Sequence, residues 1–163
     1  MKYMKLDNLD RKELLHELEE MPHYLATNFA NLPNNETKKR SSTGGFSPVE
    51  HVWHLADLEE KGFAFRLQQL LSETDPVLPD FEGGKIAEER DYRKLSLKEG
   101  LRAFTKTRKS NIKAIREITE DQWFNKGQLE GVGEITLCDM PSMLSQHDSG
   151  HRKEIEFWMK ENA

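Results

Sequence analysis

Residues 140–158, MPSMLSQHDSGHRKEIEFW, decide the fold class of this chain. Their apolar and imidazole side chains recur every three or four residues, which is the spacing of one face of an α-helix. The recurring positions are Met140, Leu144, His147, His151, Ile155 and Trp158. The pattern predicts a helix that begins between Thr136 and Pro141 and ends near Lys160, with two histidines on the face that packs against the core.

The composition favours amphipathic helices throughout. The chain has 163 residues, the length of one ordinary domain, and we expect a single domain over residues 1–163. Hydrophobic residues make up 36% and charged residues 33%, so apolar side chains should gather on helix faces rather than in long buried strands.

Three further segments, residues 6–32, 47–72 and 96–118, have helical periodicity. Pro22 lies inside the first and can kink that helix. The second begins with Ser47-Pro48-Val49-Glu50, in which a Ser cap, a Pro at the first helical position and a Glu three residues after the cap are typical of a helix start. The third segment has a stripe that is apolar except for Arg108, and its members are Leu97, Leu101, Phe104, Arg108, Ile112, Ile115 and Ile118.

The connections differ in length. Residues 33–45 indicate a solvated loop, and residues 73–95, with two prolines and a Gly-Gly pair, indicate a long crossover that can hold a short helical turn. Residues 127–137 predict a glycine-punctuated loop or a short hairpin. Four long helices and one long crossover together predict an all-α fold, a four-helix bundle.

His147 and His151 are candidate metal ligands. Residues four apart are neighbours on a helix face, so their imidazoles can converge on one cation. A buried imidazole needs partners for both nitrogens, and a shared cation supplies one. The alternative is that the stripe opens at the end of the bundle, where each imidazole hydrogen-bonds to water.

A third ligand should come from another helix. Residues 47–72 offer His51 and His54, and the helical periodicity does not choose between them. We expect His16 and His23 to be exposed.

Three charged residues near these histidines have two possible roles. Asp57 and Asp148 could orient ligands or pass protons, although helix carboxylates more often face solvent. Arg152 could bind an acidic substrate or simply be solvated.

Several function classes are disfavoured. The net charge of −5 provides no positive field for a phosphate backbone, so we expect no nucleic acid partner. We find no apolar segment of membrane-spanning length and no signal-peptide core, which predicts a cytoplasmic protein without a membrane partner. Cys138 is the only cysteine, which excludes an internal disulfide. The paired Glu-x-x-His motifs of di-iron bundles are also missing.

The segments FSPVEHVWHLADLE (residues 46–59) and GEITLCDMPSMLSQHDSGHRKEI (residues 133–155) resemble the DinB/YfiT-like metalloenzymes, a family of four-helix bundles named after damage-inducible proteins. The resemblance continues through DYRKLSLKEGLRAFTKTRKSNIKAI (residues 91–115) and QWFNKG (residues 122–127), so it covers most of the chain from Phe46 to Ile155. The chain departs from the family pattern at Phe46, Pro141 and Glu154, none of which is a ligand position.

This resemblance implies a metal triad of His54, His147 and His151. It implies a divalent ion, zinc or nickel before iron or manganese, and a homodimer. Some members use a low-molecular-weight thiol such as bacillithiol or mycothiol, so we expect a thiol S-transferase that acts on a small-molecule electrophile. The alternatives are a metal-dependent hydrolase and a non-catalytic, dimerising stress-response bundle.

Overall fold

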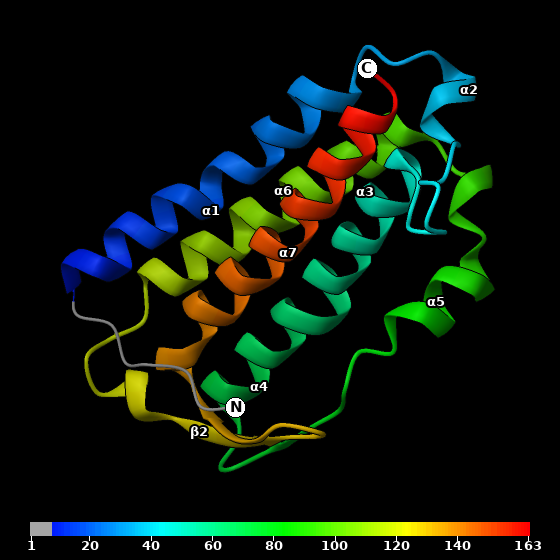
Figure 1. The fold of residues 1–163 in the computed structure, drawn as a ribbon. Helices are drawn as coiled ribbons and strands as arrows, with labels where there is room; N and C mark the ends of the chain where they lie inside the picture. Colours follow the sequence, from blue (N-terminus) through cyan, green and yellow to red (C-terminus); the bar gives the residue numbers. More distant parts are fainter. Residues whose placement is uncertain (1–7) are drawn as a thin grey trace.

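The computed structural model describes residues 8–163 and confirms the all-α four-helix bundle (Figure 1). Three sides of the bundle are single long helices, and the fourth is a composite helix in which a π-helical segment, η1, joins two α-helices. The elements are α1 (Asn8–Phe29), α3 (Pro48–Asp57), η1 (Leu58–Ala64), α4 (Phe65–Ser72), α6 (Leu97–Arg116) and α7 (Met140–Glu161). Helix α1 packs against α6 and α7, and α3 packs against α6.

The predicted start of the composite helix is confirmed. Ser47 Oγ accepts a hydrogen bond from the Glu50 backbone N–H at 3.4 Å, and Glu50 Oε1 accepts one from the Ser47 N–H at 3.1 Å. These two bonds satisfy backbone donors that have no partner within the helix. They fix the first turn of α3, and this helix carries both His51 and His54.

Segment η1 changes the register of the composite helix. A π-helix contains more residues per turn than an α-helix, so side chains beyond Asp57 rotate relative to an ideal period of 3.6 residues. Both Glu59 and Phe63 are buried in this segment. Periodicity could not choose between His51 and His54 because both are buried in α3, before the π-helical segment begins. Helix α1, in contrast, continues through Pro22.

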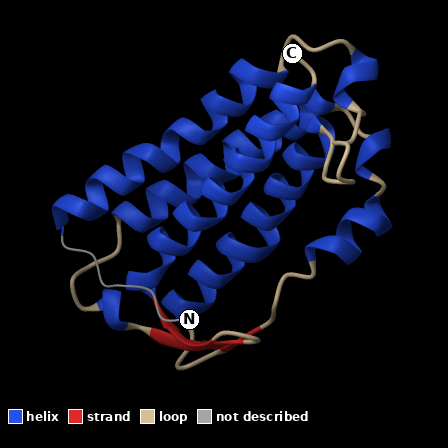
Figure 2. Ribbon diagram, in the orientation of Figure 1, coloured by secondary structure: helices blue, strands red, loops and turns tan. Residues whose placement is uncertain are grey.

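The connections contain more structure than the sequence indicates. A short helix, α2 (Asn34–Thr37), lies in the predicted loop, and the crossover holds a strand, a helix and a 3₁₀ turn. The predicted hairpin is present, and a crossover strand pairs with it in parallel to form a sheet of order β1-β2-β3 at one end of the bundle (Figure 2). The added elements are β1 (Val77–Leu78), α5 (Gly83–Arg90), η2 (Tyr92–Lys94), η3 (Gln122–Phe124), β2 (Lys126–Leu129), β3 (Gly133–Thr136) and η4 (Leu137–Asp139).

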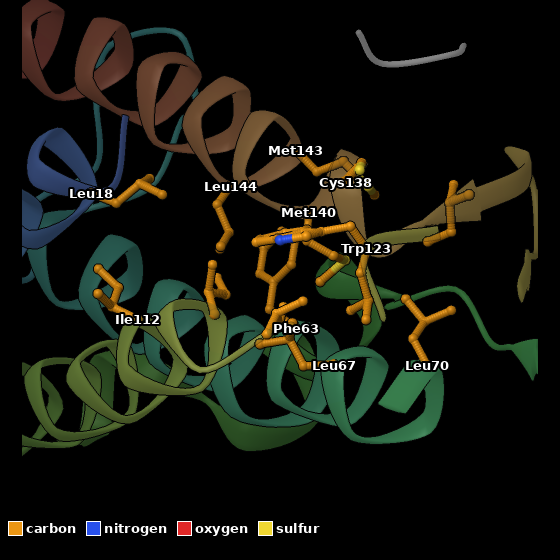
Figure 3. Packing of buried hydrophobic residues seen from close by; sticks show 14 of the residues in the cluster. Leu18, Phe63, Leu67, Leu70, Ile112, Trp123, Cys138, Met140, Met143 and Leu144 are labelled. Carbon is orange, nitrogen blue, oxygen red and sulfur yellow. The ribbon is translucent and has the colours of Figure 1, made fainter. Parts of the chain in front are cut away.

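The core consists of two apolar clusters. At the sheet end, Trp123 lies among Phe63, Leu67 and Met140, with the buried thiol of Cys138 close by (Figure 3). The second cluster, around Phe29, Phe104 and Trp158, fills the other end. Along α7, both histidines lie between Leu144 of the first cluster and Ile155 of the second. Within residues 8–163, no helix combines the length and apolar character needed to cross a membrane.

Candidate metal centre

The structure brings the three histidines of the predicted triad together. His54 extends from α3, and His147 and His151 extend from α7. One ring nitrogen from each lies within 4.8 Å of the others. The ring centroids are 4.6 Å apart for His147 and His151, 4.9 Å for His54 and His151, and 5.6 Å for His54 and His147. A single cation could therefore contact all three after small side-chain adjustments.

His51 lies on the other side of His151. Its Nδ1 is 3.1 Å from Nδ1 of His151, and Oε2 of Glu154 lies 3.9 Å from His51 Nε2. His51, His151 and Glu154 thus form a second group of potential ligands whose atoms lie within 4.8 Å of one another. His151 belongs to both groups, whereas His51 does not join His54 and His147. As expected, His16 and His23 are exposed.

Burial keeps the imidazoles uncharged at neutral pH. Desolvation is the main cause that lowers the pKa of His51, His54 and His147 to about 4 each. The pKa of His151 falls to about 2, because desolvation is reinforced by the other three rings. Metal binding requires an unprotonated ring nitrogen, so no proton has to be removed from these residues at pH 7.

The donor set fits a divalent transition metal. His54 Nδ1 is buried and has no hydrogen-bond partner among the described residues. An unsatisfied buried polar atom destabilises the fold by about 1–3 kcal/mol, so a cluster that contains one gains from a ligand. Neutral imidazoles suit zinc, nickel, copper and iron better than calcium or magnesium.

The crossover closes over His54. Gly83 begins α5, and a Cβ atom at this position would lie 2.7 Å from His54 Cε1. Asp57 anchors the crossover to α3. Its carboxylate accepts a 2.6 Å hydrogen bond from Tyr92 Oη and forms an ion pair with Arg90. Asp57 therefore holds a structural contact in this arrangement, whereas the sequence suggested ligand orientation or proton transfer as its possible roles.

Asp148 likewise holds a structural contact, with the guanidinium of Arg108. Arg108, 2% exposed, uses all five of its N–H donors: two reach Glu59, two reach Asp148 and one reaches the Leu18 carbonyl. This buried network joins η1, α6 and α7 beside His147. Its signal in the sequence was the position of Arg108 on an otherwise apolar stripe.

A pocket of about 420 Å³ opens onto the centre. His54 and His147 form part of its lining, Phe63, Phe81 and Met143 contribute apolar walls, and Asp80 and Gln146 lie at exposed positions. Arg66 contributes a cation that is only 6% exposed, with Cζ 5.4 Å from the centre of the Phe63 ring. No pattern in the sequence pointed to Arg66 as a residue of this pocket.

Arg152 does not line this pocket. Its guanidinium stacks on Tyr24, with Cζ 4.4 Å from the ring centre. A role for Arg152 in binding an acidic substrate at the histidine cluster therefore finds no support.

Comparisons with known proteins agree with the fold. Residues 17–155 match the sequence profile of the DinB superfamily. A candidate metal-dependent hydrolase of Oceanobacillus iheyensis is 28% identical over 88 residues, which cover 54% of this chain and 51% of that protein. The match thus spans about half the length of this curated relative.

Two solved structures share the bundle. YfiT from Bacillus subtilis, described as a probable metal-dependent hydrolase with an unusual four-helix bundle topology, superposes with a TM-score of 0.88 at 18% identity, over 98% of this chain and 93% of YfiT. A mycothiol-dependent maleylpyruvate isomerase superposes with a TM-score of 0.72 at 13% identity, over 95% of this chain and 63% of that one. At such low identity the similarity concerns the fold alone.

Proposed function

This chain belongs to the DinB superfamily, and from this premise we propose that it is a metal-dependent enzyme whose divalent cation is bound by His54, His147 and His151. The observation that carries the proposal is the convergence of three neutral imidazoles beside a pocket. Three protein ligands leave coordination positions for a small molecule, as in catalytic rather than structural sites. A bound cation would supply Lewis acidity and lower the pKa of a group that binds to it.

The pocket residues favour an amphiphilic substrate with a negative charge. The buried guanidinium of Arg66 can donate charge-assisted hydrogen bonds to a carboxylate or phosphate. Phe63 and Phe81 can cover an apolar portion. Because His54 and His147 line the same pocket, an anionic group held at Arg66 would leave the rest of the molecule near the histidines.

The first reaction we propose is S-transfer from a low-molecular-weight thiol to a small electrophile. The thiol sulfur forms a bond to carbon, the leaving group departs with its electron pair, and the thiol proton passes to solvent. Asp57 and Asp148, which lie close to the triad in sequence, are already engaged by Tyr92, Arg90 and Arg108, so neither is placed to act as a general base. A thiol, with its pKa near 8.5, depends less on such a base than water does.

Hydrolysis is the second candidate, and one observation favours it. Asp80 lines the same pocket as His54 and His147 and could accept a proton from attacking water. The names of the Oceanobacillus relative and of YfiT refer to hydrolases, whereas that of the isomerase refers to a thiol. The two candidates differ in their need for a thiol and in their sensitivity to loss of the Asp80 carboxylate.

Metal analysis of protein purified without a polyhistidine tag tests the premise of both reactions. We expect about one equivalent of transition metal, identified by its X-ray absorption edge. Less than a tenth of an equivalent after reconstitution would exclude the metalloenzyme and favour a non-catalytic bundle.

Turnover of model electrophiles, measured with and without added thiol, then separates the two reactions. Thiol-dependent turnover that survives Asp80→Asn supports S-transfer. Thiol-independent turnover that is lost in Asp80→Asn supports hydrolysis.

A further inference from the structure

His51 is the member of the histidine cluster to which the proposed triad assigns no role. Its side chain is 1% exposed, and its Nδ1 lies 3.1 Å from Nδ1 of His151. The two rings are almost perpendicular, at 88°. This distance is that of a hydrogen bond, so one of the two nitrogens carries a proton and the other accepts it.

We propose that His51 is a positioning residue that holds His151 as the Nδ1–H tautomer and thereby leaves Nε2 of His151 as the metal-binding nitrogen. The inference rests on the proposed metal site. In this arrangement Nδ1–H of His151 donates to Nδ1 of His51, and the proton of His51 must then lie on Nε2. A ligand histidine whose second nitrogen donates to a fixed acceptor is oriented and becomes a stronger ligand.

The surroundings of His51 favour this choice of tautomer. The carboxylate of Glu154 lies 3.9 Å from His51 Nε2, so a proton on that nitrogen faces a negative charge. The distance is longer than a hydrogen bond, and the contribution is therefore electrostatic. Phe46 packs edge-on against His51, with ring centroids 5.6 Å apart, and restricts rotation of the ring.

A competing explanation is that His51, His151 and Glu154 bind a second cation. Their potential ligand atoms are close enough. Against it, the Glu154 side chain is 59% exposed, whereas the two imidazoles already lie at hydrogen-bonding distance from each other. The two explanations predict different metal stoichiometries.

Cobalt(II) binding to the full chain provides the first test. His51→Leu removes the acceptor, and we expect the Co²⁺ dissociation constant to rise about 10- to 100-fold, with a shift of the visible absorption bands. His51→Asn restores an acceptor near the position of Nδ1 and should remain within about threefold of the wild type by the same reasoning. His23→Leu, at an exposed histidine, is the matched control.

Two outcomes would overturn the inference. One is an unchanged dissociation constant in His51→Leu. The other is binding of two equivalents, with the second lost in both His51→Leu and Glu154→Gln, which would make these residues ligands.

Imidazole ¹⁵N NMR of the metal-free wild-type protein provides a test that is independent of metal and of any variant. We expect Nδ1–H for His151 and Nε2–H for His51. The opposite tautomers would refute the positioning role. If the wild type binds no metal, the proposed function fails, while this spectrum still decides the hydrogen bond, so the two failures are distinguishable.

Discussion

Both carboxylate oxygens of Asp148 accept hydrogen bonds from the guanidinium of Arg108, at 2.8 Å for Oδ1 and 2.7 Å for Oδ2. The same guanidinium holds Glu59 of η1. Asp148 follows His147 directly in the chain, so this ion pair sets the position of α7 against the composite helix. The candidate metal centre therefore lies beside a buried charge network that positions α7.

Arg108→Met should destabilise the protein by about 3–5 kcal/mol, because it leaves two buried carboxylates without their cation. Urea unfolding followed by circular dichroism measures the loss. Arg102→Met, at an exposed position of the same helix, should change stability by no more than about 0.5 kcal/mol. A loss below about 1 kcal/mol in Arg108→Met would mean that the network does not stabilise the bundle.

Metal removal should lower the melting temperature, and His147→Gln should abolish the difference. A ligand that binds only the folded state stabilises it, by about 2.7 kcal/mol at a concentration 100 times its dissociation constant. Differential scanning fluorimetry with and without Zn²⁺ after chelator treatment measures the effect. His23→Gln should retain the full shift, and an equal shift in His147→Gln would remove this residue from the triad.

Gly83→Ala should weaken metal binding at least about tenfold, by displacing a ligand from its productive geometry. The added Cβ would lie 2.7 Å from His54 Cε1, so the buried ring or the crossover must move. Gly84→Ala is the matched control, since its Cβ would meet no atom within 4 Å. Competition with a chromophoric chelator measures both dissociation constants. Equal affinities in the two variants would show that the crossover does not constrain His54.

Arg66→Gln should lower kcat/KM about 10- to 100-fold for anionic substrates, because a charged hydrogen-bond donor in a buried pocket is lost. Neutral analogues of the same size should be affected far less. Arg66→Lys should recover part of the loss, and Arg93→Gln at an exposed position should have no effect. Equal losses for charged and neutral substrates would indicate a structural role for Arg66 instead.

The helices could be predicted because their signals are local. A cap at Ser47 and a stripe along residues 140–158 depend on neighbours within a few residues, and the structure agrees with both. The pairing of β1 with β2 could not be predicted in this way. Val77 pairs with Gln128, far away in the chain, and a strand of two residues carries no period of its own.

The partners of the charged residues were also beyond the sequence. Arg108 lies on the apolar stripe of α6, which indicated that it faces inward but not what it meets there. The carboxylates it binds come from η1 and α7, and only the packing of these helices brings them together. The same holds for Gly83, whose contact with His54 depends on the path of the crossover.

For the candidate metal centre, the sequence determined that His147 and His151 share one helix face, because residues four apart on a helix are always neighbours. The sequence pattern left open whether His51 or His54 is the third ligand, and the resemblance to a family favoured His54. Only the tertiary structure decided how the two differ: His54 faces both histidines of α7, and His51 contacts His151 from the other side. The physical reason is that the direction of a side chain between helices depends on how each helix is rotated in the bundle.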